Sequence, residues 1–280
     1  MRRLLLLTAL LTLSALVGAQ AQNDSVDIYA YRSEELRCDN NGESIYGLAY
    51  IPEGLEQPFP TIVFSHGYGG THESGATLAQ FLVTRGIAVY TYDFRGGSAR
   101  SQSDGNTTEM SVLTEADDLN AVIETLQAQS FVDEKSLFLF GESQGGIVSA
   151  IVAASRPEDI RGLILQYPAF VIGDDMHKMY ASLVEIDDTV DFMGMSLGRA
   201  YYADMWDYDV YEHIGAYTSD VLIFHGDGDQ LVPLSYSQQA AEVYDAAQLE
   251  IFPGQGHGFD RNYMNAMLQM TYGYIVTRIE

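Results

Sequence analysis

Short apolar runs alternate with longer amphipathic stretches along most of this chain. Continuous runs of this length are typical of strands that are covered on both faces, so they predict a mainly parallel sheet. The predicted strands are 61–64, 88–93, 137–140, 163–166, 221–224 and 249–252, with 26–32 and 44–51 as an opening antiparallel pair. The stretches between them predict helices at 72–85, 107–129, 144–155, 234–246 and 260–279.

The alternation breaks at about 169–214, where aromatic residues, methionines and acids are mixed without a strand period. We therefore expect one α/β domain over 22–280 with a cap inserted at about 169–214, because 280 residues suit one large domain. Aromatic rings with a polar tip suit an aromatic or mixed-polarity ligand, although each can equally pack the cap onto the sheet. The aromatic residues of the cap include Tyr180, Phe192, Tyr201, Tyr202, Trp206, Tyr208 and Tyr211.

The first 21 residues have the pattern of a signal peptide. Arg2 and Arg3 precede an apolar stretch over 4–17, and Ala19 and Ala21 form a small-residue cleavage site. A membrane anchor needs about 20 apolar residues and fits less well. We expect cleavage before Gln22, a secreted or periplasmic protein, and no membrane association once the peptide is removed.

Acidic residues far outnumber basic ones, at 39 against 14, which gives a formal net charge of −25. Such a surface repels nucleic acid and anionic membranes, so neither is an expected partner. The charge does not select a substrate. Cys38 is the only cysteine, which excludes an internal disulfide and leaves stability to the core.

A G-x-S-x-G motif lies between the strand 137–140 and the helix 144–155, with Ser143 at its centre. In this context the motif is typical of the nucleophile elbow of α/β-hydrolases. An acid follows the strand 221–224, as Asp227 or Asp229, and His257 follows the strand 249–252. The order Ser, Asp, His is that of the α/β-hydrolase triad.

The residue types suit acyl transfer. A serine hydroxyl becomes a useful nucleophile when a neutral imidazole takes its proton, and a carboxylate orients that imidazole. The developing oxyanion needs two N–H donors. We expect them from the backbone of Gln144, directly after the nucleophile, and of Tyr68, in the glycine-rich loop after the strand 61–64.

Three segments together resemble the small bacterial α/β-hydrolases that include cinnamoyl and feruloyl esterases: 66–70, 92–97 and 141–146. The resemblance extends over almost the whole chain after the signal peptide. It implies Asp229 rather than Asp227 as the triad acid, from the match at 225–233. One position departs from the pattern of this group: Glu142 precedes the nucleophile, where these esterases commonly carry His.

The sequence thus predicts an α/β-hydrolase fold with helices on both faces of the sheet, and a secreted serine esterase with Ser143, Asp229 and His257 as its triad. The resemblance implies short-chain or aromatic acyl esters, either small molecules or linked to polysaccharide. No cofactor or metal is expected, because side chains and water suffice to make and break an acyl-enzyme. The alternatives are a peptidase-like or acyl-transferring α/β-hydrolase and, in another class, a catalytically silent ligand-binding protein.

Overall fold

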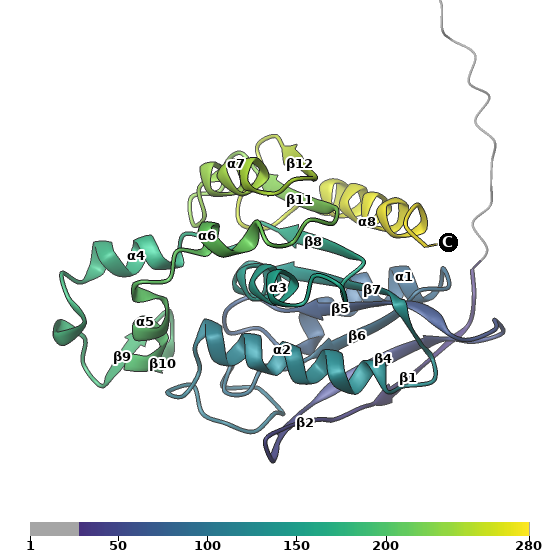
Figure 1. Ribbon diagram of the computed structural model, residues 1–280, viewed down its shortest axis with the longest axis horizontal. Helices are drawn as coiled ribbons and strands as arrows, with labels where there is room; N and C mark the ends of the chain where they lie inside the picture. The colour runs from purple at the N-terminus through teal and green to yellow at the C-terminus, as the bar shows by residue number, and fades with distance from the viewer. Residues whose placement is uncertain (1–27, 280) are drawn as a thin grey trace, which may run out of the picture.

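The computed structural model describes residues 28–279, and the predicted signal peptide lies outside them. An eight-stranded sheet runs through the molecule in the order β1-β4-β6-β5-β7-β8-β11-β12 (Figure 1). The strands from β6 to β12 in that order pair in parallel, while β1 and β4 are antiparallel to their neighbours. The predicted α/β class and mainly parallel sheet are confirmed.

Each predicted strand run corresponds to a strand, some of them longer than expected. The sheet comprises β1 (Tyr31–Glu35), β4 (Gly47–Pro52), β5 (Phe59–Ser65), β6 (Ala88–Tyr92), β7 (Val132–Glu142), β8 (Gly162–Gln166), β11 (Val221–Gly226) and β12 (Ala247–Phe252). A small hairpin of β2 (Cys38–Asn40) and β3 (Glu43–Ile45) lies between β1 and β4 in the chain. Of the strand predicted at 26–32, residues 26–27 lie outside the described residues, and 28–30 were wrongly included because pairing with β4 begins at Tyr31.

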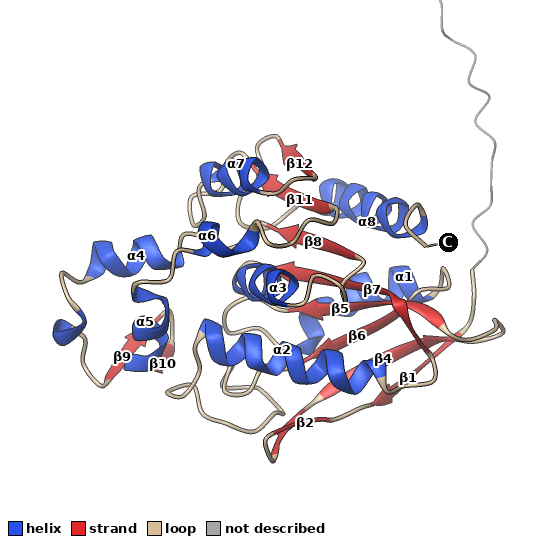
Figure 2. Ribbon diagram, in the orientation of Figure 1, coloured by secondary structure: helices blue, strands red, loops and turns tan. Residues whose placement is uncertain are grey.

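Helices cover both faces of the sheet, as predicted (Figure 2). The helices α2 (Val112–Gln127), α3 (Gln144–Ser155) and α7 (Leu234–Val243) pack into one apolar core, and α1 (Ala76–Val83) and α8 (Arg261–Val276) pack into the other. A 3-10 turn, η1 (His72–Gly75), leads into α1. The predicted helix at 107–129 begins only at Val112, because the Ser111 side chain caps it in a reciprocal pair with Thr114.

The cap leaves the sheet after β8 and returns to it at β11. It consists of α4 (Ile172–Met179), η2 (Leu183–Glu185), β9 (Thr189–Phe192), β10 (Met195–Gly198), α5 (Arg199–Trp206) and α6 (Val210–Ile214). In Figure 1, α4, α5 and the β9–β10 hairpin project from the left of the sheet, away from the chain's C-terminus. None of the helices within 28–279 is long and apolar enough to cross a bilayer.

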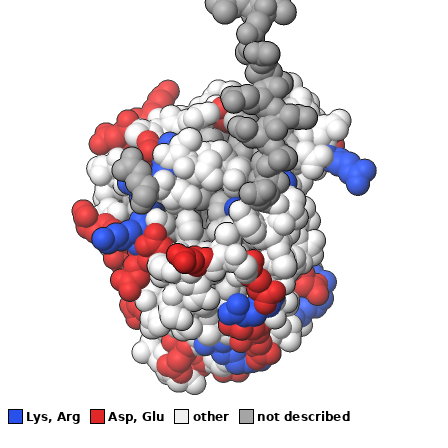
Figure 3. Space-filling model, turned by 90° about the vertical axis from the view of Figure 1, so that its right-hand side faces the viewer, with Lys and Arg blue, Asp and Glu red and all other residues white. Residues whose placement is uncertain are grey.

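Charged side chains are unevenly spread over the side of the molecule opposite the cap. On this face they gather along the left and lower edges, and a basic side chain projects at the upper right (Figure 3). Cys38 is buried, and its sulfur lies 3.3 Å from the hydroxyl of Tyr90. Burial raises the pKa of the Cys38 thiol, which leaves it a poor nucleophile.

Glu115 of α2 is an acid without a cationic partner, 1% exposed in the core between α2 and α3. Burial raises its pKa well above the usual value, although a hydrogen bond from Gln144 acts in the opposite direction. The folded state therefore keeps this proton over a pH range in which the unfolded chain has released it. This contribution makes folding less favourable as the pH rises above about 4.3, the unfolded value.

We expect Glu115→Gln to raise the stability of the protein more at alkaline pH than at acidic pH, because glutamine keeps an acceptor oxygen and does not titrate. The gain in urea midpoint over the parent chain should be larger at about pH 8 than at about pH 5. Exposed Glu134→Gln on β7 is the control, and its effect should change little between the two pH values. An equal shift for Glu115→Gln at both pH values would contradict the assignment of a neutral buried carboxyl.

Candidate active site

The turn from β7 into α3 presents Ser143 in a conformation that side chains rarely adopt, with φ +51° and ψ −115°. Two glycines make the turn possible. A Cβ on Gly145 would lie 2.2 Å from the carbonyl oxygen of Ser65, and one on Gly141 would lie 2.3 Å from that of Gly145. Only glycine fits at either position, so the strand, turn and helix close tightly around the serine.

Asp229 lies in the turn after β11, where both carboxylate oxygens are engaged. Oδ1 accepts the N–H groups of Leu231 and Val232, each at 2.9 Å, and Oδ2 lies 2.7 Å from Nδ1 of His257. Burial alone would raise the pKa of this carboxyl, but the hydrogen bonds from His257 and the backbone outweigh it and hold the pKa below its usual value. Asp229 is therefore a fixed anion beside the imidazole.

His257 completes a continuous hydrogen-bonded line, with Nε2 2.8 Å from Oγ of Ser143. The structure thus brings together the three residues predicted as a triad, from three separate strand ends. The other candidate acid, Asp227, has a different task. It accepts the N–H of Gly254 at 2.6 Å and so holds the glycine-rich loop that carries His257.

The two predicted oxyanion donors lie on segments next to the serine. Gln144 is the first residue of α3, where backbone N–H groups have no partner within the helix. The loop of Tyr68 also approaches the nucleophile, since a Cβ on Gly67 would lie 3.1 Å from Cβ of Ser143. Within the described part of the chain, the N–H groups of Tyr68 and Gln144 have no protein acceptor, and both remain available to a ligand.

Sequence reasoning missed Tyr167, which packs on the histidine. Its ring centroid lies 4.4 Å from that of His257, and its backbone has a φ of +36°. The hydroxyl of Tyr167 donates to Glu142 at 2.8 Å and accepts from Gln166 at 2.7 Å. The signal was its position one residue beyond a buried strand, at the edge of the sheet that also carries the serine.

Glu142, the residue that departs from the pattern of related esterases, is the partner of this tyrosine. Burial raises the pKa of its carboxyl, although the hydrogen bond from Tyr167 and the charge of His257 act the other way. Through the ring of Tyr167, which Glu142 holds by a hydrogen bond, the imidazole has a second packing partner besides Asp229. We infer that they help to fix the ring of His257.

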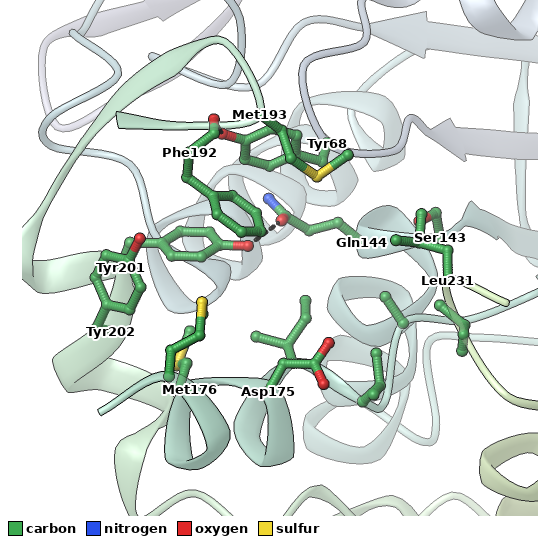
Figure 4. Close-up of a pocket in the computed structure, with 15 residues that line it drawn as sticks. Tyr68, Ser143, Gln144, Asp175, Met176, Phe192, Met193, Tyr201, Tyr202 and Leu231 are labelled. Carbon is green, nitrogen blue, oxygen red and sulfur yellow. Dashed lines mark hydrogen bonds between the residues drawn. The ribbon is translucent and has the colours of Figure 1, made fainter. Parts of the chain in front are cut away.

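A cavity opens beside Ser143 (Figure 4). Its walls are chiefly apolar and come from the cap, from the Tyr68 loop and from the turn after β11. The lining residues are Tyr68, Ser143, Gln144, Ala169, Val171, Ile172, Asp175, Met176, Met179, Phe192, Met193, Tyr201, Tyr202, Leu231 and Val232. Of the predicted cap aromatics, Phe192, Tyr201 and Tyr202 line it, whereas Tyr180, Trp206, Tyr208 and Tyr211 do not.

The polar features of this cavity are few. Tyr201 donates to the Gln144 side chain at 2.8 Å, and the amide of Gln144 donates onward to Glu115 at 2.8 Å, which ties the cap to the residue after the nucleophile. Asp175 of α4 turns its carboxylate towards the cavity in Figure 4. Among residues 28–279, no cluster of His, Cys, Asp and Glu is arranged to hold a metal ion. The prediction that no cofactor is needed stays a prediction.

Comparison with known proteins agrees with this fold. Residues 56–197 match the Hydrolase_4 family model, described as serine aminopeptidase, S33. The solved structure of Est1E from Butyrivibrio proteoclasticus with ferulic acid bound superposes with a TM-score of 0.79 and 23% identity, over 87% of this chain and 98% of that chain.

Among curated proteins, the uncharacterized protein Rv2307c of Mycobacterium tuberculosis is 28% identical over 209 residues, which are 74% of this chain and 66% of that protein. The chain thus spans just under two thirds of that relative's length. The caffeoylshikimate esterase of Arabidopsis thaliana is 31% identical over 126 residues, which are 44% of this chain and 37% of that protein. The predicted resemblance to α/β-hydrolases is confirmed, and the chain belongs to the Hydrolase_4 family of hydrolases.

Proposed function

We propose that this protein is a secreted serine esterase that cleaves hydroxylated aromatic acyl esters through an acyl-enzyme. The observation that carries the proposal is the hydrogen-bonded line from Asp229 through His257 to Ser143, which opens onto an apolar cavity. The signal peptide expected from the sequence supports export. The names of the Arabidopsis relative and of the ferulic acid complex of Est1E support an aromatic acyl group.

The proposed reaction begins when Oγ of Ser143 attacks the ester carbonyl and Nε2 of His257 takes its proton. The negative charge that forms on the carbonyl oxygen is stabilised by the N–H groups of Tyr68 and Gln144. The imidazolium then donates its proton to the leaving alcohol, while Asp229 stabilises the imidazolium without becoming protonated. A water molecule, deprotonated by His257, releases the acid and restores the serine.

The cavity lining supports an aryl group. Tyr68, Tyr201 and Phe192 offer ring faces and edges to a flat acyl chain. Asp175 adds a carboxylate to a largely apolar wall. Its Oδ1 accepts from Lys178 at 2.8 Å, which leaves Oδ2 to accept from a phenolic hydroxyl. The same carboxylate also suits the ammonium group of a peptide N-terminus, and with the family's description it favours an aminopeptidase as the second candidate.

Turnover should depend on the triad. We expect mature protein starting at Gln22 to hydrolyse methyl ferulate, and Ser143→Ala and Asp229→Asn each to lower kcat by roughly 10⁴-fold or more. An amino-acid p-nitroanilide tests the peptidase, and a fluorophosphonate tests for a reactive serine. Turnover of the anilide alone would favour the second candidate. Folded protein that neither hydrolyses an ester nor reacts with the fluorophosphonate would favour a silent binding protein.

Variants of Asp175 should show which polar group of the substrate this carboxylate binds. We expect Asp175→Ala to raise KM for methyl p-coumarate by roughly tenfold, because a hydrogen bond to a charged group is lost. Methyl cinnamate, which lacks the hydroxyl, is the matched control and should be nearly unaffected. Asp175→Asn should partly restore binding of the hydroxyl but not of an ammonium group. Equal effects on both esters would exclude contact with the phenol.

Tyr167 should affect the chemical step more than binding. We expect Tyr167→Phe to lower kcat by roughly tenfold at constant KM, since the ring stays on His257 but the bond to Glu142 is lost. Tyr167→Leu, which removes the ring as well, should lower kcat further. Glu142→Gln keeps an acceptor and is the conservative control, with a smaller loss. If both tyrosine variants retain full kcat, Tyr167 does not position the histidine.

A further inference from the structure

A second cavity, of about 370 Å³, lies on the other side of α4 from the catalytic cavity. It is bounded by α4, the connection from α5 to α6, and α7. Successive residues of α4 face different cavities, since Asp174 and His177 line the second while Asp175 and Met176 line the first. The two cavities therefore share one helix as a wall.

Four half-buried aromatic residues line the second cavity: Trp206, Tyr208, Tyr211 and Tyr236. Three of them are cap aromatics that do not line the catalytic cavity, and Tyr236 belongs to α7. Trp206 is held in place by His177, whose ring lies 4.2 Å away and whose Nε2 donates to the Trp206 carbonyl at 2.7 Å. These two contacts hold Trp206 against α4.

The polar groups of this cavity fall into two sets. Asp174 already accepts from the Tyr236 hydroxyl, and Asp209 accepts the Tyr211 N–H at 2.9 Å at the start of α6. The carboxylate of Asp207, the amide of Gln239 and the indole N–H of Trp206 have no protein partner among residues 28–279, and none is sealed away from solvent. The open groups are therefore both acceptors and donors.

We propose that this second cavity binds a neutral sugar, as one or two pyranose units. A sugar hydroxyl donates and accepts, which matches a mixed set of open groups, and the apolar face of a pyranose packs on an aromatic ring. An organic cation would need acceptors only, whereas the open groups of this cavity include the donors of Gln239 and Trp206. Asp174 and Asp209 each use one carboxylate oxygen in a hydrogen bond within the protein. The volume also falls in the range of sites for ligands larger than a small ammonium ion.

A sugar bound here would lie across α4 from the catalytic cavity. This arrangement suits an ester whose acyl group enters the first cavity while its sugar portion occupies the second. That use of the cavity rests on the proposed esterase activity, but the binding of sugar does not.

Trp206 is the only tryptophan of the sequence, so intrinsic tryptophan fluorescence reports on this cavity directly. We expect xylobiose or cellobiose to change the emission of the full mature chain saturably, with a Kd on the order of 1 mM. Choline and spermidine are titrated in parallel as organic cations. Saturation by a cation without saturation by either disaccharide would overturn the proposal, as would no saturable response to any of them.

Variants of exposed lining residues locate the binding without disturbing the core. Asp207→Ala and Gln239→Ala should each weaken disaccharide binding by about tenfold, the loss expected for a hydrogen bond. Asp175→Ala, in the other cavity, is the matched control and should leave the Kd unchanged. Unchanged affinity in both Asp207→Ala and Gln239→Ala would place the sugar elsewhere and overturn the proposal.

The activity assay separates the two proposals. Sugar binding by protein that does not hydrolyse methyl ferulate would refute the esterase and leave the sugar site in place. Ester hydrolysis without disaccharide binding would support the esterase and refute the sugar site.

Discussion

The turn at Ser143 is the constraint on which the rest of the site depends. It joins β7 to α3, and Ser143 has a positive φ. Backbone hydrogen bonds link it to a second strained turn after β8, where Tyr167 also has a positive φ. The N–H of Ser143 donates to Gln166, and its carbonyl accepts from Ala169, both at 2.9 Å. Each strained residue costs about 1–3 kcal/mol, so the two turns persist because the surrounding sheet and helices fix them. The nucleophile and the tyrosine on the histidine are thus held by one local structure.

Two acids, buried Glu115 and half-buried Glu142, are hydrogen-bonded close to the nucleophile. Glu142, before it, accepts from Tyr167, and Glu115, in α2, accepts from the side chain of Gln144, after it. Burial raises the pKa of both carboxyl groups, whereas the hydrogen bonds to Asp229 keep that carboxyl ionised. The site therefore holds Asp229, with its lowered pKa, against Nδ1 of the imidazole, and uses the other two carboxyl groups as hydrogen-bond partners of Tyr167 and Gln144.

The sequence was sufficient for the sheet, because buried parallel strands are short continuous apolar runs bounded by turns. It also located Ser143 and His257, since motif and strand end coincide there. Tyr167 and Glu115 could not be found in this way. Their importance comes from contacts between segments far apart in the chain, such as the ring of Tyr167 on His257 and the carboxylate of Glu115 at Gln144. The bounds of α2 needed the capping geometry of Ser111, which a hydrophobic pattern does not contain.

The cap shows the same limit most clearly, because its aromatic residues look alike in the sequence but divide between two cavities. The direction of each side chain follows from the short helices α4 and α5, where Tyr201 and Tyr202 turn to the catalytic cavity and Trp206 to the other. Since α4 forms a wall of both, a ligand in either cavity contacts the same helix. Any coupling between the two ligands through α4 must be reciprocal, so whatever tightens α4 for one ligand alters the binding of the other by the same factor.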